Sequence, residues 1–207
     1  MHQTRQETTT KLPLPRKGTK YVVRAFSHLR ESVPVLIAIR DMLHLAKTAN
    51  EVKSMIKQKL LKLNGKVVED PRESIRLFNV LEAGKTYGLT LLSTGKFSLE
   101  EQKEKNKRLC KVVNKKLLGK GKIQLNFHDG TNIISNEKID VGDSVYLDFE
   151  SKIKSCVSLG KGADIFVMSG KYSGLTGKVE SVKNEKVKIK LENKVETELD
   201  KSQVAAR

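Results

Sequence analysis

The chain has 207 residues, of which 40 are Lys or Arg and 24 are Asp or Glu, so its formal net charge is +16. This charge exceeds what solubility requires and indicates a polyanionic partner, which could be RNA, DNA or an anionic membrane. No apolar run approaches the roughly 18 residues of a membrane span, and the first residues lack the apolar centre of a signal peptide. We therefore expect a soluble cytoplasmic protein of two or three small domains.

The first 30 residues predict an extended basic arm. The part from residue 11 onward contains Pro13 and Pro15 and shows neither a helical nor a strand period. Such a segment is either a solvated tail or a strand-like arm that a partner orders. We favour the arm because its basic residues interleave with Tyr21, Val22 and Val23, so that one side can pack and the other can meet phosphate. The candidate RNA-binding residues of the arm are Arg16, Lys17, Lys20 and Arg24.

Two helices are predicted next. Ser32 can cap the first, with Pro34 in its first turn, where a missing amide hydrogen costs nothing. Its predicted buried residues are Val35, Leu36, Ile39, Met42, Leu43 and Ala46. Thr48 and Glu51 have the spacing of a capping box, so a second helix should begin at Thr48.

The second helix runs into a predicted hairpin. Val52, Met55 and Ile56 would face a core, with Lys53 and Lys57 on the opposite face. After residue 59 the period changes to two, and Asn64-Gly65 supplies the positive φ angles of a two-residue turn. We expect these lysines to lie close together and to bind a nucleic-acid backbone. The candidate residues of this region are Arg40, Lys47, Lys53, Lys57, Lys59, Lys62, Asn64 and Lys66.

The rest of the chain predicts mainly strands. Residues 75–80 and 87–92 read as two strands, and the polar residues 98–108 read as a surface helix or a linker. Two series of short strands follow, each typical of a small barrel. The glycine-rich loop at 170–177 adds the candidates Lys171, Tyr172 and Lys178. Lys186, Lys188 and Lys190 alternate with apolar residues and could line RNA or protect an exposed strand from aggregation.

The sequence offers no catalytic or metal site. Gly170-Lys171 and Gly177-Lys178 are followed by Tyr172 and Val179, so neither completes a phosphate-binding P-loop. The four histidines are scattered, and Asp140, Asp143 and Asp148 lack the spacing of a calcium loop. Cys110 and Cys156 are isolated, and we interpret both as reduced, packed thiols. We expect no enzyme activity, no cofactor, no metal and no small-molecule substrate.

Several segments resemble known RNA-binding modules. Residues 35–68, ending in LLKLNGKVV, look like the S-four type RNA-binding fold, and GADIFVMSGKYSGLTGKVESV (162–182) is similar to the KOW motif. Their order, after the arm KLPLPRKGTKYVVRA, resembles the archaeal and eukaryotic "e" type of small-subunit ribosomal protein four. SHLRESVPVLIAIRDML (27–43) and LCKVVNKKLLGKGKIQLNFHDGTNI (109–133) also resemble segments of this family.

The resemblance implies a fold, a function and partners. The fold would be α+β, with an arm (1–30), an S-four-type module (31–97), a linker or short helix (98–108), a central β-barrel (109–157) and a KOW or SH3-like barrel (158–207). The function would be that of a structural constituent of the small ribosomal subunit that binds the 5′ region of its rRNA beside neighbouring ribosomal proteins. An alternative is a KOW-containing assembly or transcription factor that binds RNA transiently.

Some departures from the family pattern bear on the expected RNA contacts. Family members usually begin with a dense basic run, whereas MHQTRQETTT contains one Arg and one Glu. An RNA-penetrating role is therefore not implied for residues 1–10. Many S-four modules carry an arginine just before the second helix, where this chain has Ala49, so Lys47 or Lys53 would have to supply that contact.

Overall fold

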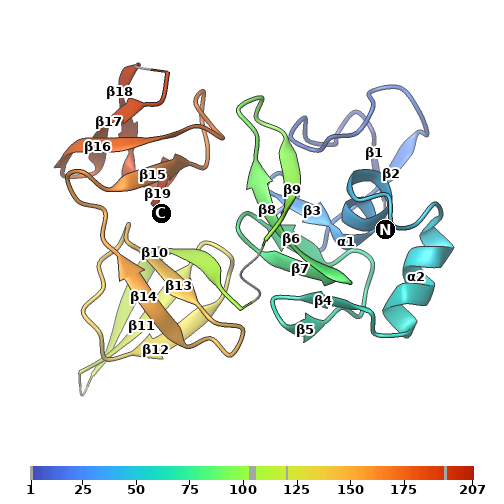
Figure 1. Ribbon diagram of the computed structural model, residues 1–207, viewed down its shortest axis with the longest axis horizontal. Coiled ribbons are helices and arrows are strands. Elements are labelled where there is room, and N and C mark those ends of the chain that lie inside the picture. The colour runs from blue at the N-terminus through green and yellow to red at the C-terminus, as the bar shows by residue number, and fades with distance from the viewer. Residues whose placement is uncertain (1, 103–105, 120, 194) are drawn as a thin grey trace. The chain divides into compact units, whose positions relative to one another are not determined.

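The computed structural model describes residues 2–102, 106–119, 121–193 and 195–207 (Figure 1). It divides into two compact units, Met1–Lys105 and Asn106–Arg207. Strands dominate both units and helices are few. The predicted α+β class therefore overstates the helical part, because helix is concentrated in one short stretch of the first unit.

The first unit contains a five-stranded antiparallel sheet and two short strand pairs. The sheet has the order β5-β4-β7-β8-β9, and the pairs are β1-β2 and β3-β6. The strands are β1 (His2–Thr4), β2 (Tyr21–Val23), β3 (Ser32–Pro34), β4 (Leu61–Leu63), β5 (Lys66–Val67), β6 (Ser74–Arg76), β7 (Val80–Ala83), β8 (Lys85–Leu91) and β9 (Phe97–Glu101). The helical segments are α1 (Val35–Ile37), the π-helical turn η1 (Ala38–Met42) and α2 (Ala49–Lys57).

The first predicted helix begins later than its sequence suggests. Ser32 is not its cap but the first residue of β3, which pairs with β6. The Ser32 hydroxyl donates to the carbonyl oxygens of Ser27 (2.8 Å) and His28 (3.0 Å). Pro34 is the residue at the helix start, and Val35 to Ile39 are all buried. The pairing with β6, which is distant in sequence, overrides the local capping signal.

The predicted extended arm is instead folded onto the first unit. Strand β1 pairs with β2, and the Arg5 guanidinium donates to the Thr19 carbonyl oxygen (2.8 Å) and to the Thr19 hydroxyl (3.0 Å). Leu12 is 4% exposed, and the Phe97 amide donates to the Lys11 carbonyl oxygen (2.8 Å). The prediction of an arm that only a partner orders is wrong, since Leu12 and Val22 are part of the core.

The start of the segment 98–108 is a strand. Phe97–Glu101 forms β9 and pairs along its length with β8. The helix considered for this segment is therefore wrong here, because Phe97 is buried and Leu99 lies opposite Leu89 in the sheet. Part of the predicted segment, residues 103–105, lies outside the described residues.

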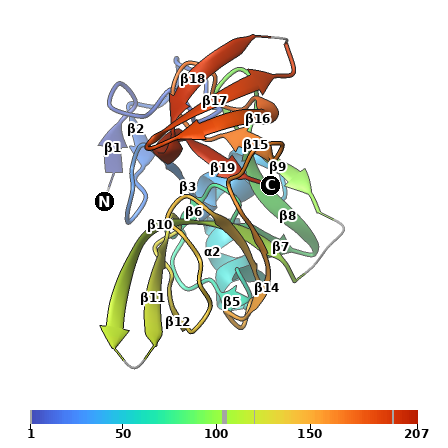
Figure 2. The same ribbon diagram turned by 90° about the vertical axis from the view of Figure 1, so that its left-hand side faces the viewer.

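The second unit is built from two five-stranded antiparallel sheets (Figure 2). The first has the order β12-β11-β10-β13-β14 and the second the order β18-β17-β16-β15-β19. Their strands are β10 (Arg108–Gly119), β11 (Lys122–Phe127), β12 (Asn132–Ser135), β13 (Ser144–Leu147), β14 (Ile153–Val157), β15 (Asp164–Val167), β16 (Thr176–Lys183), β17 (Lys186–Leu191), β18 (Glu196–Asp200) and β19 (Val204–Ala206). A short 3-10 helix, η2 (Lys201–Gln203), precedes β19.

Each sheet of the second unit covers its own apolar core. The first core includes Val112, Leu125 and Phe127, and the second includes Val167 and Ile189. Strands β12 and β14 remain at opposite edges of the first sheet, and β18 and β19 at opposite edges of the second. Within the described residues, strand pairing therefore does not close the barrels that the sequence predicts.

A glycine in β16 makes a close backbone contact that predicts a stability effect. A Cβ atom on Gly177 would lie 2.5 Å from the Lys190 carbonyl oxygen on β17. We expect Gly177→Ala to reduce the free energy of unfolding by about 1–3 kcal/mol, because the two strands must separate. The matched control is Gly160→Ala, whose Cβ would have no neighbour within 4 Å. Equal unfolding midpoints of the two variants in urea would contradict the prediction.

Candidate nucleic-acid interface

Helix α2 begins where the capping signal predicts. The Thr48 hydroxyl accepts a hydrogen bond from the Glu51 amide (3.3 Å), and the Glu51 carboxylate accepts one from the Lys47 amide (2.7 Å). The latter bond is the main reason that the pKa of Glu51 is lowered. Lys53 and Lys57 lie one turn apart and both are exposed. The cap therefore fixes the start of a helix that presents two lysines to solvent.

The hairpin that follows α2 has the predicted two-residue turn. Asn64 and Gly65 have φ angles of 50° and 81° and join Leu63 to Lys66, which lie opposite each other. The Asn64 side-chain oxygen accepts a hydrogen bond from the Val80 amide (2.9 Å). Asn64 therefore ties the turn to β7 through its side-chain oxygen, and its side-chain NH2 group has no hydrogen bond to the described residues.

The lysines of the hairpin do not share one face. Lys62 lies opposite Val67 on one side and Glu82 on the other, whereas Lys66 lies opposite Leu63. Because residues directly opposite each other project from the same face of a sheet, Lys62 and Lys66 project from opposite faces. The expectation of a single lysine cluster is therefore wrong for this pair, and Glu82 partly neutralises the surroundings of Lys62.

The basic residues on either side of α2 differ in whether their charge is already paired with a carboxylate. The Arg40 guanidinium forms two hydrogen bonds to the carboxylate of its neighbour Asp41, at 3.0 and 2.8 Å. Its charge is therefore already paired. Lys47 and Lys59 are exposed, and Lys59 occupies the turn between α2 and β4 with a φ angle of 56°.

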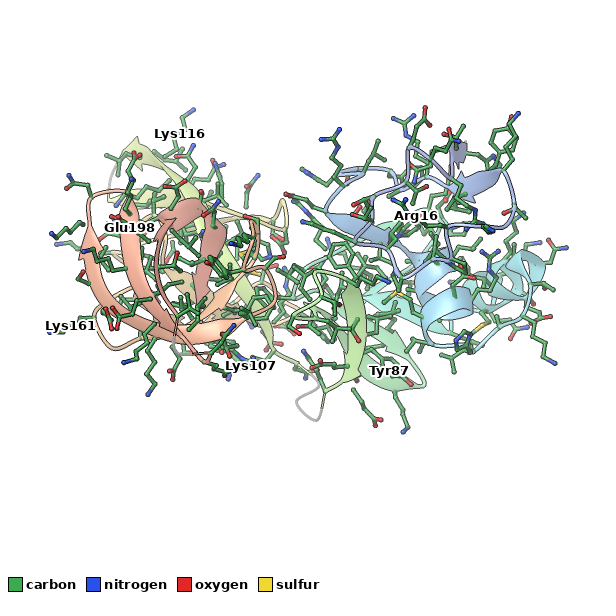
Figure 3. All side chains as sticks on the ribbon, turned by 90° about the horizontal axis from the view of Figure 1, so that it is seen from above. Arg16, Tyr87, Lys107, Lys116, Lys161 and Glu198 are labelled. Atoms are coloured by element: carbon green, nitrogen blue, oxygen red, sulfur yellow. The ribbon has the colours of Figure 1, made fainter. Side chains whose placement is uncertain are left out.

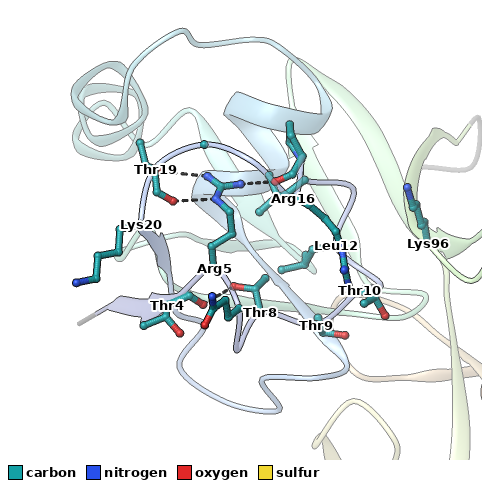
Figure 4. A pocket seen from close by; sticks show the side chains of 14 residues that line it. Thr4, Arg5, Thr8, Thr9, Thr10, Leu12, Arg16, Thr19, Lys20 and Lys96 are labelled. Carbon is teal, nitrogen blue, oxygen red and sulfur yellow. Dashed lines mark hydrogen bonds between the residues drawn. The ribbon is translucent and has the colours of Figure 1, made fainter.

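Basic residues of the N-terminal segment line a pocket that also contains threonines and apolar side chains (Figure 4). Arg5 lies at the centre of the pocket. Its guanidinium donates hydrogen bonds to Thr19 and to the Pro15 carbonyl oxygen (2.5 Å). Arg16 and Lys20 line the pocket and are exposed, as is the neighbouring Lys17. Arg24 is only partly exposed. Arg5 therefore holds the loop together, and the predicted residues Arg16, Lys17 and Lys20 remain open to solvent.

The glycine-rich loop of the second unit places its candidate residues in different settings. Tyr172 packs against the core of the β15–β19 sheet, and the Lys171 ammonium lies 5.6 Å from the centre of its ring. Lys178 is exposed and lies 3.8 Å from the Asp164 carboxylate. Tyr172 thus contributes packing to this core, and Lys171, which has no carboxylate partner among the described residues, is the less constrained of the two lysines.

The lysines of β17 are matched by acids. The burial of β17 alternates strictly, and Lys186, Lys188 and Lys190 lie opposite Asp200, Glu198 and Glu196 of β18. Lys190 and Glu196 lie at the limit of an ion pair, 4.0 Å apart. This pairing favours the interpretation that the lysines keep the sheet surface solvated. Figure 3 labels Glu198 on this surface.

Sequence reasoning missed two buried charges in β10. Arg108 pairs with Asp129, and both side chains are almost fully buried. The Lys111 ammonium donates to the backbone carbonyl oxygens of Lys201 (2.5 Å) and Ser202 (2.8 Å), and burial lowers its pKa to about 8. The first five residues of β10 are all buried, so buried and exposed positions do not alternate there. An alternating pattern in the sequence could therefore not have identified Arg108 and Lys111 as buried.

The two cysteines have different environments. Cys110 is buried, and burial is the main cause that raises the pKa of its thiol. Cys156 is exposed on β14, so the prediction that both thiols are packed is wrong for Cys156. Across the described ranges, no three His, Cys, Asp or Glu residues group as metal ligands, and no helix is long and apolar enough to cross a membrane.

Comparisons with known proteins agree on one family. The model of the Ribosomal family S4e matches residues 83–153. The small ribosomal subunit protein eS4 of Methanocella arvoryzae is 33% identical over 178 residues, which cover 83% of this chain and 76% of that protein. The protein of the same name from Archaeoglobus fulgidus is 30% identical over 189 residues, which cover 88% and 80% of the two chains.

A solved structure shares the fold. The crystal structure of the 30S ribosomal protein S4e from Thermoplasma acidophilum superimposes with a TM-score of 0.74 and 24% identity, covering 85% of this chain and 94% of that one. Together with the sequence identity to the archaeal relatives over most of both chains, these matches show that the chain belongs to the ribosomal family S4e.

Proposed function

We propose that this protein is a constituent of the small ribosomal subunit that binds and stabilises small-subunit rRNA, in the 5′ region of that RNA. The observation that carries the proposal is the cap-fixed helix and hairpin at residues 48–68, which carry exposed lysines on α2 and on both faces of the hairpin. The hairpin forms the β5 edge of the five-stranded sheet, and lysines on the two faces of this edge can contact phosphates of more than one RNA segment. The family membership supports the same function.

The proposal assigns roles to the segments of the chain. Residues 31–97 would form an S-four-type module, 109–157 a central β domain and 158–207 a KOW-like domain. Residues 1–30 would add a basic surface through Arg16, Lys17 and Lys20, which are exposed. Neighbouring small-subunit proteins would be further partners, on the cytoplasmic ribosome. No catalytic step belongs to this function.

Sedimentation after a salt wash tests the proposal. We expect the native protein to remain with small ribosomal subunits in a sucrose gradient after a high-salt wash, because several phosphate contacts would have to break at once. Release at moderate salt, while established subunit proteins stay bound, would instead assign the protein to transient assembly or transcription factors.

A further inference from the structure

The three strands β10, β11 and β12 present a face that none of the preceding assignments uses. Leu125 and Phe127 of β11 point into the core and are buried. Because side chains alternate along a strand, Gln124 and Asn126 project from the opposite, outer face. The hydrogen bond from the Gln124 side-chain amide to the Asn126 side-chain oxygen (2.9 Å) agrees with this placement.

Amide side chains line this outer face. Asn126 lies directly between Asn114 on β10 and Asn132 on β12, so three asparagines form one row across three strands. In the next row, Gln124 lies between Lys116 and Ile134. Strand alternation places Lys122 on the same face. We call this set the amide face; it comprises Asn114, Lys116, Lys122, Gln124, Asn126, Asn132 and Ile134.

The charge of the amide face is uncompensated. The sequences of β10, β11 and β12 contain no Asp or Glu. In the described part of the chain, no carboxylate forms an ion pair with Lys116 or Lys122, whereas the lysines of β17 lie opposite acids. Figure 3 shows Lys116 pointing away from the ribbon. The face therefore complements an anion and is unlike the lysine-bearing surface of β17.

We propose that the amide face binds the minor groove of an rRNA helix. This inference rests on the proposed function and adds a contact surface to it. Three strands span about 10 Å, and the minor groove of A-form RNA is wide and shallow. An amide both donates and accepts hydrogen bonds, which suits 2′-hydroxyls and base edges. Lys116 and Lys122 would contact the flanking phosphates, and Ile134, which is 60% exposed, would contact a ribose.

Two double variants separate the amide contacts from the charge contacts. The probes are a transcript of the 5′ region of small-subunit rRNA, titrated at several salt concentrations, and an RNA duplex and a DNA duplex of one sequence. Lys116→Ala with Lys122→Ala should lower the slope of log affinity against log salt by about two. Asn114→Ala with Asn132→Ala should weaken transcript binding about tenfold with an unchanged slope, and should reduce the preference for RNA over DNA duplex.

The control removes two lysines from the compensated surface, by Lys188→Ala with Lys190→Ala. The proposal is overturned if this control lowers the salt slope as much as Lys116→Ala with Lys122→Ala does. It is also overturned if the asparagine variant keeps its RNA preference, or if both face variants bind RNA normally but no longer sediment with subunits, which would assign the face to a protein partner.

Different results would contradict the amide-face proposal and the proposed function. Failure of the unaltered protein to bind the rRNA transcript would remove the proposed function itself. Normal binding that depends on Lys53, Lys57 and Lys66 but not on the amide face would remove the present inference alone. Alanine keeps the backbone N–H and C=O groups that pair β10, β11 and β12, and circular dichroism of each variant checks the fold.

Discussion

Replacing Lys53, Lys57 and Lys66 by alanine is expected to weaken rRNA binding about a hundredfold, taking on the order of 1 kcal/mol for each phosphate contact. All three are exposed, two on α2 and one on the hairpin. Each lost contact leaves counterions on the RNA, so the slope of log affinity against log salt should fall by about three. Titration of an rRNA transcript at several salt concentrations measures both quantities.

The choice of lysines follows from the register of the hairpin. Lys62 is left intact because it lies opposite Glu82, whose negative charge offsets part of its attraction for phosphate, so we expect Lys66 to contribute more to RNA binding. The control changes Lys186, Lys188 and Lys190 to alanine, which removes the same charge from a surface where acids lie opposite. The proposal that the helix and hairpin bind rRNA would be contradicted by an unchanged salt slope in the first variant. It would also be contradicted by an equal fall of the slope in the control.

Local signals predict the helix and hairpin well because they act between residues close in sequence. The start of α2 depends on Thr48 and Glu51, three residues apart. The turn depends on Asn64 and Gly65, which tolerate positive φ angles better than other residues. Neither feature needs a distant part of the chain, so both could be predicted from the sequence alone.

Predictions failed where a distant segment decides the structure. Ser32 has the chemistry of a helix cap, yet β6, more than forty residues away, draws it into a strand. Leu12 gave no periodic signal, but it is buried in the first unit. The spacing of the lysines in the sequence predicts that they lie close together, whereas strand pairing places Lys62 and Lys66 on opposite faces of the sheet.

The sequence likewise does not show which cations are paired in the folded protein. Arg40, Arg108 and Lys111 look in sequence like the exposed cations around them. In the structure Arg40 is paired with Asp41, Arg108 with Asp129, and Lys111 with two backbone carbonyl oxygens. A net charge of +16 therefore indicates a polyanionic partner, but only the structure separates cations that can meet it from cations that hold the fold.

Replacing Asp129 by alanine is expected to reduce the free energy of unfolding of the second unit by about 3–5 kcal/mol, because it leaves the buried Arg108 charge without its carboxylate. The side chains of Arg108 and Asp129 are 5% and 1% exposed. Asp129 also accepts hydrogen bonds from the Thr131 amide (2.9 Å) and hydroxyl (2.7 Å). Urea unfolding of the whole protein measures the loss.

The pH dependence of stability should change in the same variant. Burial opposes ionisation of Asp129, but the Arg108 charge and the Thr131 hydrogen bonds outweigh it, so the pKa of Asp129 is lowered. A lowered pKa in the folded state stabilises the protein above the unfolded-state value of about 3.9, and this contribution disappears as the pH falls through the folded-state pKa. The unaltered protein should therefore lose stability in acid more steeply than Asp129→Ala.

Two further variants identify the unpaired charge as the cause. Changing Arg108 to Met together with Asp129 to Leu should recover much of the stability, since a buried ion pair can be replaced by apolar side chains of similar volume. Glu150→Ala breaks the exposed pair of Glu150 and Lys152 and should cost less than about 1 kcal/mol. If the double variant is less stable than Asp129→Ala alone, the loss comes from packing around Asp129, and the unpaired Arg108 charge is not its source.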